Sequence, residues 1–311
     1  MKLFPSLLCI LFFSLSGYAQ KITFTPQWTP QSQFAGYYAA FENGYYAELG
    51  LDVEIKHPSA FYSSTSMLKD GTSDIITCEL IQAMIEADKG VKFVNLLQTI
   101  QHSTLVLISR IKDIRNISDL AGRRIGTWKI GFNEIPHMID EEQDLNIEWI
   151  KFNNPLNLYI SGAIDAALVK NYNELILFPM SGIIPESTLY FSELGFDFPE
   201  DGVYVSEEFF KEKPLQCRLF AEASRKGWEW VRNNREKALE IVMKYVKAEN
   251  APTNIYNQRA MLDTILEAQI DIKGGAPSYS LKVEDFNRLN ETLIRFGYIS
   301  KPIEYEGFIG D

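Results

Sequence analysis

The sequence predicts an α/β protein of two similar lobes, each a mostly parallel sheet flanked by helices. Short apolar strands alternate with helices through the first two thirds of the chain, as is typical of parallel α/β sheets. The 311 residues are enough for two domains. A short motif also occurs twice: a helix ends at Gly71 or Gly162, and Asp74 or Asp165 then precedes an apolar strand. The glycine is expected to close the helix in a left-handed turn, and the aspartate to hold the turn into the strand.

The first 19 residues have the features of a secretory signal peptide. Lys2 precedes the apolar run Leu3–Phe13, and Gly17 and Ala19 are the small residues expected before cleavage at Gln20. The apolar run is well short of the roughly 20 residues that a membrane-spanning helix needs. No lipoprotein-type cleavage site is evident. We therefore expect a soluble protein that is exported to the periplasm or secreted.

The first lobe is expected to begin with a strand at Ile22–Phe24 and a helix from about Gln31 to Asn43. Phe34, Tyr38 and Phe41 recur at helical spacing, which predicts that they share a buried face. Apolar runs bounded by turn residues predict the following elements: strands at Leu51–Ile55, Asp74–Thr77 and Val91–Leu97, and helices at Ser63–Lys69 and Leu80–Asp88.

The second lobe repeats the alternation after an apolar strand at Leu105–Ser109. Its predicted elements are helices at Ser118–Leu120, Phe132–Asp140 and Leu156–Ile160, and strands at Ile125–Thr127, Ile147–Phe152, Ala166–Val169, Leu189–Phe191 and Val203–Val205. From Ser206 onward the pattern is helical, and this tail is expected to pack back onto the first lobe. Leu105–Ser109 and Val203–Val205 are the expected crossings between lobes.

Composition and missing motifs exclude several classes of function. The formal net charge of −11, without a Lys/Arg cluster, argues against nucleic acid as a partner. No nucleotide-binding, metalloprotease or serine-hydrolase motif is present, so we expect no cofactor and no catalytic set. The three histidines have no metal-site spacing, and His57, before Pro58, is expected in a solvated turn. Cys78 and Cys217 are expected to be free, buried thiols.

Polar and aromatic side chains gather at the expected carboxyl ends of strands, where open α/β sheets bind ligands. Rings offer stacking area, while amides and carboxylates orient a ligand. The alternative is that the rings belong to the core or cap a helix and that the acids are solvated. The candidate ligand-binding residues are Trp28, Gln31, Gln33, Phe34, Tyr37, Glu79, Gln101, Trp128, Glu134, Asn171, Tyr172 and Glu174.

Seven segments, in this order, resemble the periplasmic substrate-binding proteins of the thiamine-pyrimidine-precursor type and the related fungal pyrimidine synthase. The resemblance spans nearly the whole mature chain, and more distant relatives bind alkanesulfonates and nitrate. The segments are Trp28-Thr29-Pro30, Gly36-Tyr37, Glu42-Asn43-Gly44-Tyr45-Tyr46, Gly50-Leu51-Asp52-Val53, Gln101-His102-Ser103, Leu120-Ala121-Gly122-Arg123-Arg124-Ile125-Gly126-Thr127-Trp128 and Arg225-Lys226-Gly227-Trp228-Glu229-Trp230.

The resemblance implies a two-lobed periplasmic-binding-protein-like fold of type II, which closes by hinge motion on a ligand in the cleft between its lobes. Residues 20–106 and 205–311 would form one lobe and residues 107–204 the other. It also implies docking on the permease of an ABC importer. The rings together with Glu79, Glu134 and Glu174, and the lack of an Arg pair for a sulfonate, predict a flat, neutral or cationic nitrogen heterocycle such as a thiamine pyrimidine precursor as the ligand. We expect a monomer. The alternatives are a ligand-sensing module for a membrane receptor and a secreted enzyme. Phe34 stands where the fungal enzyme has its active-site histidine, which argues against synthase activity.

Overall fold

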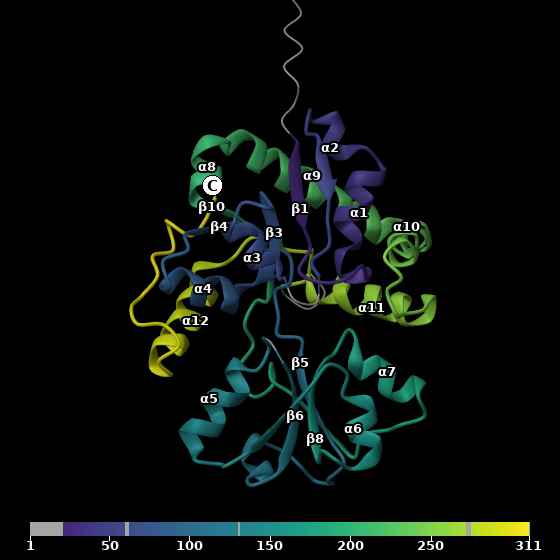
Figure 1. Ribbon diagram of the computed structural model, residues 1–311, viewed down its shortest axis with the longest axis vertical. Coiled ribbons are helices and arrows are strands. Elements are labelled where there is room, and N and C mark those ends of the chain that lie inside the picture. The colour runs from purple at the N-terminus through teal and green to yellow at the C-terminus, as the bar shows by residue number, and fades with distance from the viewer. Residues whose placement is uncertain (1–20, 60–61, 130, 272–274, 311) are drawn as a thin grey trace, which may run out of the picture.

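The computed structural model describes residues 21–59, 62–129, 131–271 and 275–310, and it shows two lobes, each built around a five-stranded sheet. The lobes lie one above the other along the long axis of the molecule (Figure 1). The predicted signal peptide lies outside the described residues. Within them, no helix combines the length and apolar composition of a membrane span. The two-lobed α/β prediction is thus confirmed.

The sheet of the first lobe has the strand order β2-β1-β3-β10-β4, and only β10 runs against the other four strands. Its strands are β1 (Ile22–Thr25), β2 (Val53–Ile55), β3 (Ile75–Glu79), β4 (Phe93–Gln98) and β10 (Asp201–Ser206). Its helices are α1 (Ala35–Glu42), preceded by a 3-10 turn at Ser32–Phe34, α2 (Tyr45–Glu48), α3 (Ser64–Lys69), α4 (Leu80–Asp88), α8 (Glu207–Glu212), α9 (Pro214–Asn233), α10 (Arg235–Ala248), α11 (Ile255–Ala268) and α12 (Val283–Arg295). Helices α1 and α9 cover one face of the sheet, whereas α4 and α12 cover the other.

The sheet of the second lobe has the order β7-β6-β8-β5-β9, and only β5 runs against the other four. Its elements are β5 (Leu105–Ser109), a 3-10 turn at Ile117–Leu120, β6 (Arg124–Trp128), α5 (Glu134–Gln143), β7 (Glu148–Phe152), α6 (Leu156–Ser161), β8 (Ala166–Lys170), α7 (Glu174–Met180) and β9 (Ser187–Tyr190). Alternate residues of β5 face opposite sides: Leu107 packs in the cluster with α5, and Ile108 in the cluster with α6 and α7.

The motif that occurs in both halves has the same structure in both. Gly71 and Gly162 follow short helices with φ of 76° and 74°, left-handed values that glycine adopts without strain. Asp74 then accepts a hydrogen bond of 2.8 Å from the Thr23 backbone N–H, and Asp165 accepts one of 3.0 Å from Arg124 N–H. Each aspartate therefore ties the turn before a central strand to the neighbouring parallel strand.

Helices α1 and α9 approach so closely that two glycines are needed at their contact. A Cβ on Gly227 would lie 2.1 Å from the Gly36 carbonyl oxygen, and one on Gly36 would lie 2.2 Å from the Trp228 ring. The buried face of α1 carries Tyr37 and Tyr38. The predicted face was partly wrong, because Phe41 is 40% exposed; the helix turns its small residues toward α9, which rotates Phe41 outward.

Replacing Gly227 by alanine is expected to lower the free energy of unfolding by about 1–3 kcal/mol, the usual cost of overpacking. The added methyl group meets a backbone oxygen, which cannot move aside as a flexible side chain can. Gly307→Ala is the matched control, since the nearest atom to its Cβ would be 3.8 Å away. Urea denaturation of both variants checks this; equal midpoints would contradict the tight helix contact.

The chain crosses between lobes at residues 99–104 and again at 191–200. The prediction that β5 and β10 are themselves the crossings was wrong, because each strand lies within one sheet and begins just after a crossing. His102 lies on the first crossing and Asp197 on the second. The His102 Nδ1 atom is 2.8 Å from the Asp197 carboxylate, and its Nε2 atom is 3.0 Å from the carbonyl oxygens of Ile270 and Asp271. Because all these partners accept hydrogen bonds, both ring nitrogens must donate, which requires the imidazolium form.

The hydrogen bond to Asp197 raises the pKa of His102 to about 9. The unfolded chain has an ordinary histidine pKa, so the stabilisation is fully present below about pH 6.5 and is lost as the pH rises through 9. We expect the melting temperature to fall over this interval and to fall less in a His102→Gln variant. Thermal melts at several pH values check this, and parallel profiles for the two proteins would contradict it.

Cys78 and Cys217 are free and buried, as predicted. Cys78 lies on β3 and Cys217 on α9, in different packing clusters of the first lobe. Burial raises the pKa of both thiols, which keeps them protonated and unreactive. They serve as small apolar core residues.

Candidate functional site

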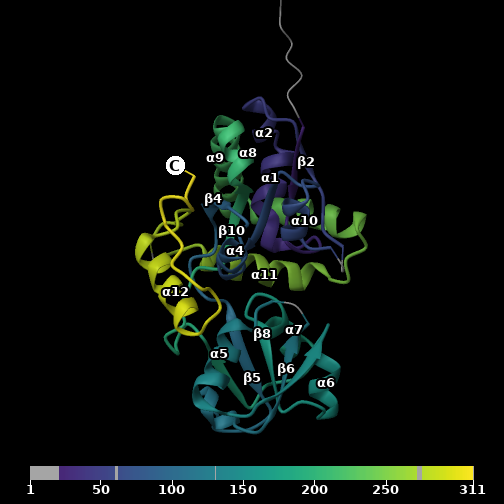
Figure 2. The same cartoon turned by 60° about the vertical axis from the view of Figure 1, so that its left-hand side comes forward.

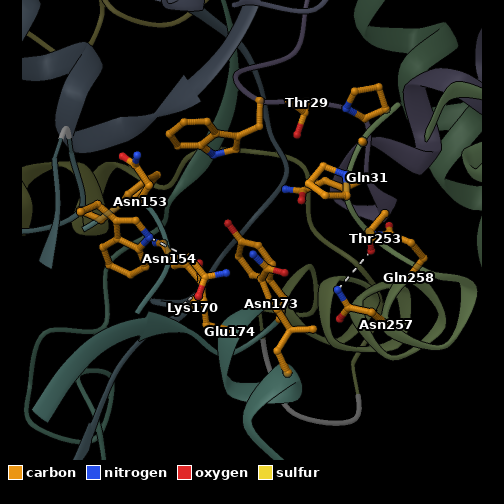
Figure 3. A pocket seen from close by; sticks show the side chains of 18 residues that line it. Thr29, Gln31, Asn153, Asn154, Lys170, Asn173, Glu174, Thr253, Asn257 and Gln258 are labelled. Atoms are coloured by element: carbon orange, nitrogen blue, oxygen red, sulfur yellow. Dashed lines mark hydrogen bonds between the residues drawn. The ribbon is translucent and has the colours of Figure 1, made fainter. Parts of the chain in front are cut away.

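A cavity of about 330 Å³ lies between the two lobes and is open to solvent. The first lobe contributes the loop after β1 and the start of α11, and the second contributes the ends of β6, β7 and β8 (Figure 3). The lining residues are Trp28, Thr29, Pro30, Gln31, Trp128, Phe132, Asn153, Asn154, Lys170, Tyr172, Asn173, Glu174, Leu177, Ala251, Pro252, Thr253, Asn257 and Gln258. Rings, amides and a carboxylate dominate this lining.

Three of the rings stand at strand ends. Trp28 follows β1, Trp128 is the last residue of β6, and Tyr172 follows β8. Trp28 is 37% exposed although it is large and apolar, whereas Tyr172 is 3% exposed. An indole that stays in contact with solvent beside a cavity is available to stack on a flat ligand.

His57 holds the backbone of Trp28, so the prediction that it is a solvated turn residue was wrong. Its Nδ1 atom is 2.5 Å from the Trp28 carbonyl oxygen, and its Nε2 atom is 2.9 Å from the Tyr38 hydroxyl. Burial lowers the pKa of His57. The neutral ring can donate through Nδ1 and accept from Tyr38 through Nε2. No local sequence pattern shows that the turn after β2 packs against the loop after β1, and this explains the error.

A chain of amides links the cavity to a buried carboxylate. Gln31 Nε2 donates to Gln33 Oε1 at 2.5 Å, and Gln33 Nε2 donates to the Asp201 carboxylate at 2.5 Å. Gln27 Nε2 donates to the other Asp201 oxygen at 3.0 Å. Burial raises the pKa of Asp201 to about 6. One N–H of the Gln31 amide is engaged by Gln33, so its second N–H and its carbonyl oxygen are left for a ligand.

Lys170 joins the lobes at the base of the cavity. Its ammonium lies 2.7 Å from Glu79, at the end of β3, and 2.8 Å from Glu200, next to β10. Burial opposes the charge of Lys170, but the two carboxylates outweigh this effect and raise its pKa above the ordinary lysine value. Glu200 also accepts hydrogen bonds from the Thr104 N–H and the Ser103 hydroxyl, at 2.8 and 3.1 Å.

Two further carboxylates are close by. Glu174, at the start of α7, accepts from the Lys170 backbone N–H at 3.0 Å and lies 3.4 Å from Trp128 Nε1. Glu134, at the start of α5, accepts a hydrogen bond from Gln82 of the other lobe. Burial raises the pKa of both acids. Glu174 thus places a carboxylate in the cavity lining, among amides that can donate as well as accept.

A family model described as NMT1/THI5 like matches residues 31–238, which is more than half of the chain. The chain belongs to the NMT1/THI5-like family. It is also 22% identical, over 90% of its length and 86% of the relative's, to the formylaminopyrimidine-binding protein of Halalkalibacterium halodurans. The recognised segments thus identified the right family.

Solved structures similar to this member of the NMT1/THI5-like family establish its fold. The periplasmic aliphatic sulphonate binding protein SsuA from Escherichia coli superposes with a TM-score of 0.65 at 12% identity, with 92% of this chain and 91% of that chain covered. The desulfurization enzyme DSZB superposes with a TM-score of 0.59 at 14% identity, with 92% and 95% covered. The fold is that of periplasmic binding proteins, and an enzyme shares it.

The predicted site residues of this NMT1/THI5-like protein fall into two groups, those that line the cavity and those that lie outside its lining. Trp28, Gln31, Trp128, Tyr172 and Glu174 line the cavity. The others lie outside that lining. Three bind polar partners through their side chains: Glu79 binds Lys170, Gln33 binds Asp201, and Glu134 binds Gln82. Phe34 and Tyr37 are buried in the core of the first lobe, Gln101 donates to the Gln98 and Ser278 carbonyl oxygens, and the Asn171 backbone N–H donates to the Thr104 carbonyl oxygen.

Sequence reasoning missed several residues of the lining. Asn153 and Asn154 directly follow β7, so the rule that ligands meet strand ends would have found them. Thr253 lies just before α11, and Asn257 and Gln258 lie in its first turn. Only the tertiary fold places this helix at the edge of the first lobe that faces the second (Figures 1 and 2). No local pattern marks them.

Proposed function

We propose that the protein is an exported, monomeric solute-binding protein of an ABC importer, which closes its lobes on a small ligand and delivers it to a membrane permease. Membership of the NMT1/THI5-like family and the periplasmic-binding-protein fold support this proposal. The interlobe position of the cavity supports it too, because hinge closure would enclose a ligand there. Neither a cofactor nor catalysis is part of the proposal.

The residues that line the cavity support the proposed ligand class, which is a flat nitrogen heterocycle such as an aminopyrimidine precursor of thiamine. Trp28, Trp128 and Tyr172 offer stacking surfaces, while Gln31 and Glu174 offer oxygens that accept from an exocyclic amine. The name of the formylaminopyrimidine-binding relative points to the same class.

The charge of the lining argues against a sulfonate. Among the described lining residues, Lys170 is the one cationic side chain, and Glu79 and Glu200 already bind its ammonium. A sulfonate would therefore meet no free cation and would face Glu174. An aminopyrimidine can instead donate to Glu174.

A thermal-shift panel tests the ligand class. A ligand present at 100 times its Kd stabilises the folded protein by about 2.7 kcal/mol, so we expect 4-amino-5-aminomethyl-2-methylpyrimidine to raise the melting temperature. Ethanesulfonate and nitrate are the comparison ligands and should leave it unchanged. Stabilisation by ethanesulfonate or nitrate, with none by the aminopyrimidine, would overturn the proposal.

Turnover separates a binding protein from an enzyme of the same fold. We expect the aminopyrimidine to be recovered chemically unchanged from a stoichiometric complex after prolonged incubation, as seen by mass spectrometry. Appearance of a new product would favour the enzyme. A ligand-sensing role uses the same closure, and genes for a permease and an ATPase beside this one would favour transport.

A further inference from the structure

The side chain of Phe132 lies where three cavities between the lobes meet. Phe132 stands in the segment that joins β6 to α5. It lines the cavity described above, a second cavity of about 370 Å³ beside α3, and a third of about 40 Å³ beside Glu134. Its ring therefore divides what would otherwise be one larger space between the lobes.

The ring of Phe132 contacts the groups that a bound aromatic ligand would contact. Its centroid lies 5.5 Å from that of Trp28 and 5.3 Å from that of Trp128, indoles that belong to different lobes. The Lys170 ammonium lies 4.5 Å from the same centroid. A flat ligand inserted between two rings needs their centres about 7 Å apart, which is two contacts of roughly 3.5 Å. No ring fits between Phe132 and either indole.

The backbone of Phe132 adopts an unfavourable conformation. Its φ of 63° lies in the left-handed region, which bulky residues rarely adopt. Such a conformation persists only where surrounding contacts offset its cost, and it is often found at functional sites. Here the offsetting contacts are those of the ring with Trp28, Trp128 and Lys170.

We infer that the space filled by the Phe132 ring is the ring subsite of the ligand, and that Phe132 is an internal substitute that the ligand displaces. This inference rests on the proposed function and sharpens its ligand class. A ring in that space has the Lys170 ammonium over its face, 4.5 Å from the centroid, which is a cation–π contact. The Glu174 carboxylate, beside Trp128, is a hydrogen-bond acceptor. The ligand ring is therefore aromatic and carries an amino group that donates to Glu174.

Replacing Phe132 by glycine tests the displacement. Glycine adopts the same backbone conformation freely, so the variant is expected to fold. Without the competing ring, 4-amino-5-aminomethyl-2-methylpyrimidine should bind roughly three- to tenfold more tightly in calorimetric titration, because the binding-competent state is no longer a minor one. Phe132→Leu, which keeps an apolar plug, should stay within about twofold of the native Kd. An unchanged or higher Kd for Phe132→Gly would overturn the inference.

Toluene provides a test that does not depend on the proposed ligand class. A vacated apolar ring site binds small aromatic molecules, so toluene should raise the melting temperature of Phe132→Gly and leave the native protein unchanged. If it does so while the aminopyrimidine binds no variant, the ring subsite stands and the proposed ligand class fails. If toluene stabilises neither protein, the ring subsite is overturned.

Discussion

Replacing Lys170 by methionine is expected to lower the free energy of unfolding by about 3–5 kcal/mol, the usual cost of removing one partner from a buried ion pair. The Lys170 side chain is 5% exposed, and those of Glu79 and Glu200 are 6% and 11% exposed. Methionine fills a similar volume but leaves two carboxylates close together without a cation. Because Glu79 lies in the first lobe and Lys170 in the second, the loss also weakens contact between lobes.

The effect of Lys170→Met should depend on pH in a defined direction. Without the ammonium, burial and the neighbouring acid raise the pKa of Glu79 above its value in the unfolded chain. A carboxyl group whose pKa is raised by folding destabilises the folded protein as the pH rises through that pKa. The loss of stability in Lys170→Met should therefore be largest at neutral pH and smaller in acid. Adding Glu79→Gln to the variant should recover part of the loss at neutral pH.

Lys69→Met is the matched control for the methionine substitution. Lys69 pairs with Glu86 at 2.8 Å, a similar distance, but its side chain is 40% exposed. Solvent-exposed pairs contribute about 0–1 kcal/mol, so this variant should unfold close to the native protein. Urea denaturation measures all three variants. Equal losses of unfolding free energy for Lys69→Met and Lys170→Met would mean that burial does not strengthen the contribution of the Lys170 ion pairs.

The features that could be predicted from sequence are those specified by neighbouring residues. Gly71 with Asp74, and Gly162 with Asp165, mark turns whose conformation depends on a left-handed glycine and a side chain three residues away. Trp28 and Trp128 were found at the cavity because each stands at the carboxyl end of a strand of its own sheet, and such strand ends bind ligands whatever the packing of the helices.

The features that could not be predicted depend on contacts between distant segments. Lys170 looks like an ordinary lysine at the end of a strand, and its role requires Glu79 and Glu200, which are 91 and 30 residues away. Gln33 was proposed as a ligand contact because it follows Trp28 closely, yet its amide binds Asp201, 168 residues away. Tyr37 is buried because α9 packs on α1. Local patterns place residues near the cleft, but tertiary contacts decide which side chains remain available to a ligand.

Replacing Trp28 by alanine is expected to weaken binding of the aminopyrimidine by about 2–4 kcal/mol, roughly 30- to 1000-fold in Kd, as for a central aromatic contact. The indole supplies the first lobe's stacking surface in the cavity and keeps that role whether Phe132 or a ligand ring lies against it. The fold should survive, because Trp28 is 37% exposed and His57 holds the backbone rather than the ring.

Phe41→Ala is the control for the loss of a half-exposed aromatic ring from the same lobe. Phe41 is 40% exposed and lies on α1, outside the cavity lining. Calorimetric titration should give the native Kd for Phe41→Ala and an intermediate Kd for Trp28→Phe, which keeps a smaller ring. If Trp28→Ala binds as tightly as the native protein, the indole merely caps the core, and stacking must come from Trp128 and Tyr172 in the second lobe alone. Ligand binding would then leave the lobes without a shared aromatic contact, and closure would depend on Lys170 and its two carboxylates.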